Sequence, residues 1–283
     1  MVTIQHSQAT DQRNALMDGT TVKSVQLPNG VNLPYVEQGG PAGVPVVFLH
    51  GVTDSWRSWE PVLPYLPGSI HAFTLSQRGH GDADRPASGY RFADFSADLA
   101  AFMDAHGIGP AIVVGHSMGS YVAQRFTMDH PERVRGLVLV GSVTTWRGNP
   151  VVTDIWESVV STLTDPVDPA FVREFQEGTG LPQELLDMVV QESLKVPAHV
   201  WRGAWHAIAN TDYSAELRKI QAPTLIIWGD QDPLCPRDEQ EALVAGIASA
   251  RLVVYPDRGH NPHWEAPERF AADLVDFIDR LTG

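Results

Sequence analysis

The sequence predicts an α/β protein with a mostly parallel sheet. Short runs of β-branched and other apolar residues, typical of strands buried on both faces, alternate with segments of helical period. One such run breaks at Gly115, presents Ser117 and restarts at once as a helix. The polar stretches that contain Asp232 and His260 also follow short apolar runs. Together these observations indicate strands whose ends carry the chemistry.

Each element has its own local signal. Two alternating segments, 22–27 and 31–36, flank Pro28-Asn29-Gly30 and predict an opening hairpin. Buried-type strands are then predicted at residues 44–49, 70–75, 111–114, 134–140, 223–228 and 251–255. Helices are predicted at residues 92–106, 117–128, 238–246 and 267–281. The sum is an eight-stranded sheet flanked by helices.

The alternation is interrupted over residues 144–210. No convincing strand occurs there, and amphipathic stretches begin at Asp154, Asp168, Pro182 and Pro197. A connection of this length with its own helices is more than a loop, and it predicts a helical cap inserted over the sheet. The predicted organisation is a tail at 1–20, a core domain at 21–143 and 211–283, and a cap at 144–210.

Composition excludes several classes of protein. The net charge of −14 and the lack of a basic run argue against nucleic acid or an anionic membrane as a partner. The first twenty residues are polar, and no stretch approaches about 18 uninterrupted apolar residues, so a cytoplasmic location is expected. The single cysteine, Cys235, excludes an intramolecular disulfide and a thiolate metal cluster.

The segment from Gly115 to Gly119 has the pattern G-x-S-x-G, whose glycines leave room for a strained serine backbone. Ser117 should therefore stand clear of the sheet, beside helix N–H groups that have no partner within the helix. A serine becomes a nucleophile only with a base nearby. An acid, either Asp230 or Asp232, and then His260 follow later apolar runs, which is the order of a catalytic triad.

These residues resemble the α/β-hydrolase superfamily, specifically its cap-bearing, esterase-like members. The resemblance extends over about residues 22–281. It is carried by His50-Gly51, Arg78-Gly79-His80-Gly81, Gly115-His116-Ser117-Met118-Gly119, Gly229-Asp230-Gln231-Asp232, Gly259-His260 and Glu265-Ala266-Pro267-Glu268-Arg269-Phe270. It implies the α/β-hydrolase fold and a reaction that needs no cofactor.

The resemblance also implies roles for single residues. It places the base at His260, with His116 and His263 as rivals, and it favours Asp232 over Asp230 as the acid that orients the base.

The oxyanion hole is implied to consist of the backbone N–H groups of Val52 and Met118. His50 is expected at the pocket as a residue that fixes the loop by hydrogen bonding. No pair of histidines has the spacing of a zinc motif, so no metal site is predicted.

Tryptophans suggest the character of the pocket. Trp201 and Trp205 are one helical turn apart in the predicted cap, and Trp146 lies near its start, so an aromatic face could cover a substrate. Large aromatic side chains on such helices more often pack a lid onto a core, and that alternative stays open. As a group, they favour an apolar or aromatic ester over a sugar or peptide.

The predicted function is a serine hydrolase that cleaves small to medium hydrophobic carboxylic esters or lactones through an acyl-enzyme on Ser117. Dehalogenases and epoxide hydrolases of this superfamily use an aspartate nucleophile, so Ser117 argues against them. Carbon–carbon bond hydrolases of ring-cleavage products, perhydrolases, cofactor-free oxygenases and slow-turnover ligand receptors share most of these motifs and stay as alternatives. The chain is expected to act as a monomer or homodimer.

Overall fold

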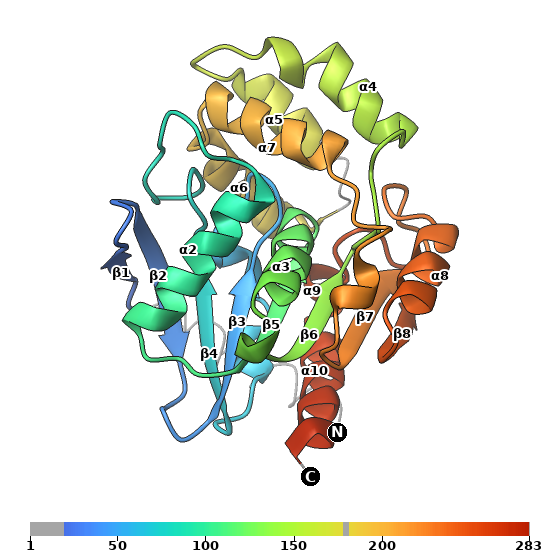
Figure 1. Cartoon of the computed structure of the whole chain (residues 1–283). Coiled ribbons are helices and arrows are strands. Elements are labelled where there is room, and N and C mark those ends of the chain that lie inside the picture. Colours follow the sequence, from blue (N-terminus) through green and yellow to red (C-terminus); the bar gives the residue numbers. More distant parts are fainter. Residues whose placement is uncertain (1–19, 178–180, 283) are drawn as a thin grey trace, which may run out of the picture.

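An eight-stranded sheet forms the centre of the protein (Figure 1). The computed structural model describes residues 20–177 and 181–282, so the predicted tail lies almost wholly outside the described residues. The strands are β1 (Lys23–Gln26), β2 (Asn32–Gln38), β3 (Val44–Leu49), β4 (Ile70–Leu75), β5 (Ala111–His116), β6 (Val134–Val140), β7 (Thr224–Gly229) and β8 (Ala250–Tyr255).

The strand order is β1-β2-β4-β3-β5-β6-β7-β8. β1 and β2 form the predicted hairpin, and β2 pairs antiparallel with β4, whereas all later pairs are parallel. The predicted fold class is therefore confirmed. β5 runs two residues further than predicted, as far as His116, which pairs with Val140 of β6.

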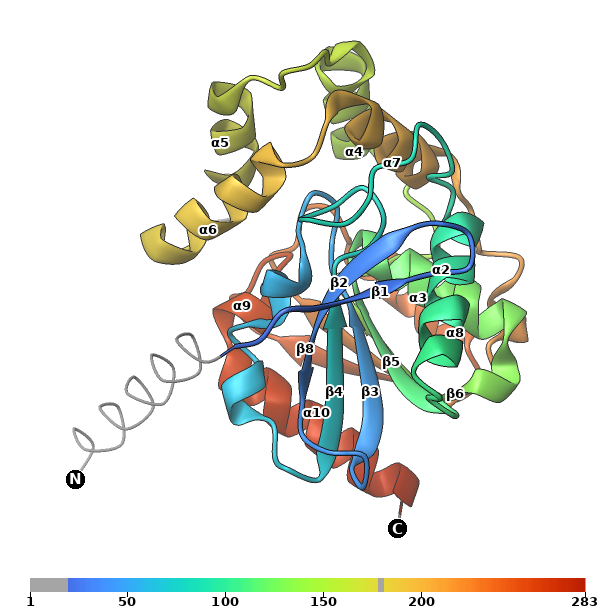
Figure 2. The ribbon, with the colours of Figure 1, turned by 90° about the vertical axis from the view of Figure 1, so that its left-hand side faces the viewer.

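Helices cover both faces of the sheet (Figure 2). One face carries α2 (Phe92–Ala105), α3 (Met118–Asp129) and α8 (Arg237–Gly246), and the other carries α10 (Pro267–Thr282), preceded by the short α9 (Pro262–Glu265). Short 3₁₀ helices occupy several connections: η1 (Trp56–Trp59), η2 (Leu63–Tyr65), η3 (Pro131–Arg133), η4 (Val160–Thr162) and η5 (Leu217–Lys219).

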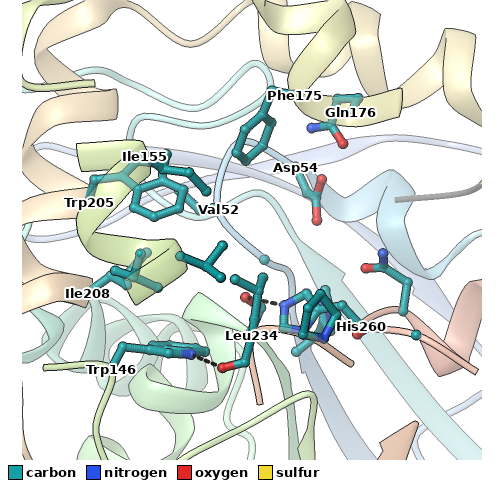
Figure 3. Close-up of a pocket in the computed structure, with 18 of the residues that line it drawn as sticks. Val52, Asp54, Trp146, Ile155, Phe175, Gln176, Trp205, Ile208, Leu234 and His260 are labelled. Atoms are coloured by element: carbon teal, nitrogen blue, oxygen red, sulfur yellow. Dashed lines mark hydrogen bonds between the residues drawn. The ribbon is translucent and has the colours of Figure 1, made fainter. Parts of the chain in front are cut away.

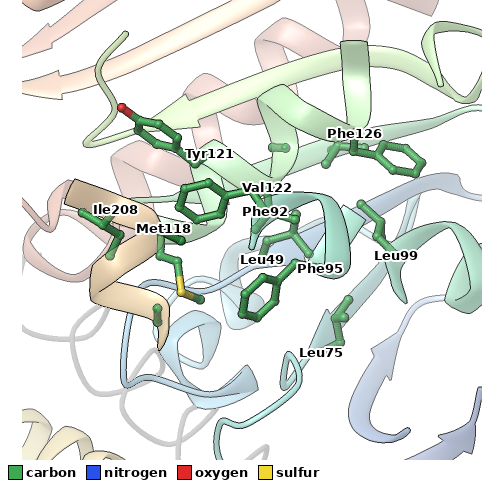
Figure 4. Close-up of a cluster of buried hydrophobic side chains, with 14 of the residues drawn as sticks. Leu49, Leu75, Phe92, Phe95, Leu99, Met118, Tyr121, Val122, Phe126 and Ile208 are labelled. Atoms are coloured by element: carbon green, nitrogen blue, oxygen red, sulfur yellow. The ribbon is translucent and has the colours of Figure 1, made fainter. Parts of the chain in front are cut away.

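Two apolar cores result, one on each face of the sheet. Strands β3, β5, β6 and β7 are almost wholly buried, because helices cover both of their faces. In Figure 4 the side chains of Phe92, Tyr121 and Met118 pack together, and Ile208 reaches this cluster from another helix. The larger core is thus continuous with the helices above the sheet.

Those upper helices lie between β6 and β7 and sit over the carboxyl ends of the strands (Figure 1). They are α4 (Pro150–Ser158), α5 (Pro169–Glu177), α6 (Gln183–Leu194) and α7 (Ala198–Asn210). We call them the helical insertion. The predicted helix start at Asp154 is wrong, because Asn149 caps α4 by accepting hydrogen bonds from the N–H groups of Val151 (3.0 Å) and Val152 (3.2 Å).

The two ends of the helical insertion meet. Thr145 and Asp212 form an isolated antiparallel bridge, and the N–H of Tyr213 donates to the carbonyl of Thr144 at 3.0 Å. The hydroxyl of Thr145 donates to the carbonyl of Thr211 at 3.0 Å. The insertion therefore begins and ends at one point, beyond the end of β6 and before the start of β7. Among the described helices, none is both long and apolar enough to cross a membrane.

Candidate active site

Ser117 occupies a strained turn between β5 and α3. Its backbone has φ 50° and ψ −117°, a conformation that side-chain-bearing residues rarely adopt. A Cβ on Gly115 would lie 2.3 Å from the carbonyl oxygen of Gly119, and one on Gly119 would lie 2.3 Å from that of Leu49. Both glycines are therefore required for the close approach of strand and helix. The turn holds the Ser117 hydroxyl at the wall of a cavity.

A chain of hydrogen bonds joins Ser117 to His260 and Asp232. The Oγ of Ser117 lies 2.9 Å from Nε2 of His260, and Nδ1 of His260 lies 2.7 Å from Oδ2 of Asp232. The other carboxylate oxygen of Asp232 accepts hydrogen bonds from the N–H groups of Leu234 (2.9 Å) and Cys235 (3.1 Å). The acid is thus fixed from both sides and orients the imidazole toward the serine.

The other candidates have structural partners instead. Asp230 accepts a hydrogen bond from the N–H of Asp257 at 2.8 Å and so ties together the two loops after β7 and β8. Nε2 of His116 lies 3.1 Å from the carbonyl oxygen of His260. Nε2 of His263 lies 3.3 Å from Ser58 Oγ. Of these histidines, His260 is the one in contact with Ser117.

The electrostatics suit a general base. Burial acts to lower the pKa of the His260 imidazole, but the attraction of Asp232, Asp54 and Glu265 outweighs it and holds this pKa above its usual value. Burial acts to raise the pKa of the Asp232 carboxyl, but His260 and the surrounding hydrogen bonds keep it below its usual value. Burial lowers the pKa of His116 and of His263, so both remain neutral.

These shifts predict the pH dependence of turnover. His260 must be neutral to accept a proton from Ser117, so kcat/KM should increase with pH through the raised pKa of His260, above the usual histidine value of about 6.5. A pH profile of ester hydrolysis measures this limb. Asp54→Asn removes one negative charge that raises the pKa of His260, so the rise of kcat/KM in this variant should occur at lower pH. A rise of kcat/KM centred at or below about pH 6, and unchanged in Asp54→Asn, would contradict the assignment of His260 as the base.

The loop after β3 carries the second predicted oxyanion donor. Val52 lines the cavity, and Thr53 next to it has φ 67°, a second strained backbone. Met118 is the first residue of α3, so its N–H has no acceptor within the helix. The side-chain amide of Gln176 in α5 donates to the hydroxyl of Thr53 at 3.2 Å, and Ser193 in α6 donates to the same oxygen at 3.0 Å. The helical insertion thus holds this strained loop.

His50 holds the loop after β3 in place through hydrogen bonds. Its Nδ1 lies 2.7 Å from the carbonyl oxygen of Gly51, and its Nε2 accepts a hydrogen bond from the N–H of Gln77 at 2.9 Å. His50 is fully buried and does not line the cavity. The expectation that it contributes to the pocket wall is therefore corrected, because its ring lies between the loops after β3 and β4.

The cavity beside Ser117 has a volume of about 600 Å³ and a mostly apolar wall. Trp146 and Trp205 line it. Trp201 does not, because it faces Phe171 and Phe175 and is fully buried among them. This corrects the expectation for Trp201. The wall also contains Val151, Val152, Ile155, Val159, Phe171, Phe175, Ile208, Pro233, Leu234 and Trp264.

Asp54 is a cavity residue that the sequence analysis missed. The residue is 5% exposed, and its side chain points into the cavity (Figure 3). Burial raises the pKa of its carboxyl to about 7, although His260, the Gly51 N–H and the Ser58 hydroxyl oppose this effect. The available signal was its position, three residues after Gly51 in the loop expected to carry an oxyanion donor.

Asp232, Cys235 and His260 also have the composition of a metal site, since one ligand atom from each lies within 4.8 Å of the others. Burial raises the pKa of the Cys235 thiol well above its usual value, so the cysteine stays protonated and is a poor metal ligand. The oxygens of Asp232 are already engaged by His260 and two backbone N–H groups. The cluster fits a proton-transfer chain better than a metal centre.

The fold and the site define one class of protein. The family model for the alpha/beta hydrolase fold matches residues 44–267, and the chain belongs to this family.

Relatives within the family carry different names. The chain is 28% identical over 272 residues to a non-heme chloroperoxidase from Streptomyces lividans, a match that covers 90% of this chain and 99% of that protein. It is 27% identical over 287 residues to a 2-hydroxy-6-oxononadienedioate/2-hydroxy-6-oxononatrienedioate hydrolase from Paraburkholderia xenovorans, covering 95% and 99%. The structure of an esterase from Exiguobacterium antarcticum superposes with a TM-score of 0.80 at 24% identity, covering 92% and 100%.

Proposed function

We propose that this α/β hydrolase is a serine carboxylic-ester hydrolase that acts on small to medium hydrophobic esters or lactones. The observation that carries the proposal is the hydrogen-bonded chain of Ser117, His260 and Asp232 at the wall of an apolar cavity of about 600 Å³. Such a chain activates a serine, and a cavity of this size and character suits a small apolar acyl or alcohol group.

The proposed reaction has two steps. Ser117 Oγ attacks the ester carbonyl while His260 Nε2 takes its proton, and the backbone N–H groups of Val52 and Met118 stabilise the oxyanion. His260 then gives the proton to the leaving alcohol, and an acyl-enzyme remains. In the second step His260 deprotonates a water molecule, which releases the acid and restores Ser117.

We also propose that the helical insertion, residues 144–210, is a cap that selects the substrate. Three of its helices contribute to the cavity wall, with Ile155 from α4, Phe175 from α5 and Trp205 from α7 (Figure 3). Most of the apolar wall therefore comes from the insertion, whereas the reacting groups come from the sheet. The predicted cytoplasmic location and monomeric or homodimeric state stay predictions.

A carbon–carbon bond hydrolase is the second candidate. The Paraburkholderia relative with that kind of name matches 95% of the chain, and this chemistry uses the same serine, histidine and acid. The two candidates differ in the bond that is cleaved. Substrates with a scissile carbon–carbon bond next to a carbonyl therefore belong in the same assay.

The test is steady-state hydrolysis of p-nitrophenyl esters of two to twelve acyl carbons, with aliphatic and aromatic lactones and a vinylogous diketone alongside. We expect many turnovers on the esters, with the highest kcat/KM for short and medium acyl chains, because the cavity of about 600 Å³ limits length. Turnover on the diketone alone would favour the second candidate. A single burst equal to the enzyme concentration would contradict ester hydrolysis and indicate a slow-turnover receptor.

A further inference from the structure

The cavity has an acidic side. Asp54 points into it, and Glu192 in α6, which lies outside the wall and pairs with Lys195 at 3.0 Å, acts to raise the pKa of Asp54 further. Glu174 of α5 lines the exposed part of the same cavity. Among residues 20–177 and 181–282, no lysine or arginine contributes to the wall. A ligand beside Asp54 therefore meets a carboxyl group with no lysine or arginine in the described wall around it.

The opposite side of the cavity is apolar. In Figure 3, Asp54 and Gln176 lie on one side, whereas Trp146, Trp205 and Ile208 lie on the other. A ligand that spans the cavity therefore meets a carboxyl group at one end and aromatic and aliphatic side chains at the other. A buried polar group that meets an apolar ligand stays unpaired and costs free energy, so a polar partner for Asp54 is favoured.

We propose that Asp54 determines substrate specificity by binding a hydrogen-bond-donating group, a hydroxyl or an ammonium, at the end of the substrate opposite its apolar group, and by excluding a carboxylate there. This inference rests on the proposed function for the identity of the reacting bond. It deepens that function by naming the polar group that the ester carries.

The chemistry of the side chain supports this choice. The two oxygens of the Asp54 carboxyl can accept several hydrogen bonds, so the side chain has acceptor capacity for a donor from the ligand. A carboxylate bound there would lie next to Asp54, and like charges in a poorly solvated site repel strongly. A dioate, the kind of substrate named for the Paraburkholderia relative, therefore fits this cavity poorly.

A matched series of esters tests the proposal. p-Nitrophenyl esters with four to eight acyl carbons are compared with methyl, hydroxyl, ammonium or carboxylate at the far end. In the wild type, kcat/KM for the best ammonium or hydroxyl ester should exceed that of the carboxylate ester of equal length by about 100-fold. The hydrogen bond gained with Asp54 and the charge repulsion avoided should each contribute about tenfold or more. Asp54→Asn should reduce this ratio about tenfold or more.

A control separates Asp54 from the general field of an acidic protein. Glu174→Gln removes one negative charge from the exposed part of the same cavity, and it should change the ratio less than about threefold because solvent screens that charge. The ratios should persist in 0.5 M salt. An equal change in both variants, or equal rates for ammonium and carboxylate esters in the wild type, would overturn the proposal.

The pH dependence supplies an independent signature. Turnover of either substrate requires neutral His260, so the effect of His260 ionisation cancels in the ratio of the two rates. Discrimination against carboxylate should grow from pH 6 to pH 8 as Asp54, whose pKa is about 7, loses its proton. The other groups that face Asp54 are His260, the neutral His116 and Glu192. In Asp54→Asn the ratio should not vary with pH.

Binding measurements distinguish failure of this inference from failure of the proposed function. Ser117→Ala is titrated calorimetrically with the methyl esters of the same acids, which cannot turn over. Tighter binding of ammonium and hydroxyl esters than of carboxylate esters supports the role of Asp54 even if no ester is hydrolysed. Turnover on the methyl-terminated esters with no preference among the polar ends supports the proposed function and overturns the inference.

Discussion

Replacing Ser117 with alanine is expected to lower kcat for ester hydrolysis by about 10⁴- to 10⁶-fold. The variant loses the oxygen that forms the acyl-enzyme, and His260 loses the hydroxyl that lies 2.9 Å from its Nε2. The remaining rate comes from the oxyanion donors and from binding alone. The measurement is steady-state hydrolysis of a short p-nitrophenyl ester.

Covalent labelling provides the control for this variant. A serine-directed phosphonate should add the mass of one phosphonyl group to each wild-type molecule, on the peptide that contains Ser117. It should add none to Ser117→Ala. The melting temperature of the variant should stay close to that of the wild type, because alanine differs from serine only by the absence of Oγ and introduces no clash. Activity that survives in a folded, unlabelled variant would disprove the assigned nucleophile.

The change Asp232→Asn is expected to lower kcat by about 10³- to 10⁴-fold. Two backbone N–H groups, of Leu234 and Cys235, point at one oxygen of Asp232, so the amide oxygen of asparagine takes that place. The amide NH₂ then faces Nδ1 of His260 and forces the ring proton onto Nε2. A histidine in that tautomer cannot accept the proton of Ser117.

Asp230→Asn is the matched comparison for the acid. Asp230 is two residues away in the same loop, but its carboxylate binds the N–H of Asp257 and not the imidazole. Its substitution should change kcat less than about threefold, with a small loss of stability from the weakened loop contact. Comparable losses of kcat in both variants would show that charge in this loop, and not contact with His260, supports turnover.

The sequence predicts most of the sheet because its signals are local. Runs of apolar residues gave the bounds of β3, β4 and β6 without error, since strands buried on both faces have few polar interruptions. The end of β5 is not a local property, because residues 115–116 are strand only through pairing with β6. The start of α4 was misplaced since the cap formed by Asn149 was not recognised.

The site divides in the same way. Ser117 lies in a motif whose spacing reflects one turn, and the family resemblance placed the base at His260, which the structure brings to 2.9 Å from Ser117 Oγ. The choice between Trp201 and Trp205 depends on how α7 packs against α5, because neighbours on one helix face can point to different surroundings. Asp54 belongs to no motif, and its raised pKa arises mainly from burial, with a smaller effect of Glu192, which is distant in sequence.

The junction at Thr145 and Asp212 bears on how such a protein can diversify. Because the two ends of the insertion pair with each other at Thr145 and Asp212, the segment between them can grow, shrink or be exchanged while the register of β6 and β7 stays the same. Under the proposed function, the side chains that contact the apolar part of the substrate and those that react with it lie in separate segments of one chain. New selectivity can accumulate above the sheet through insertions and deletions, without the loss of foldability that such changes cause inside a strand.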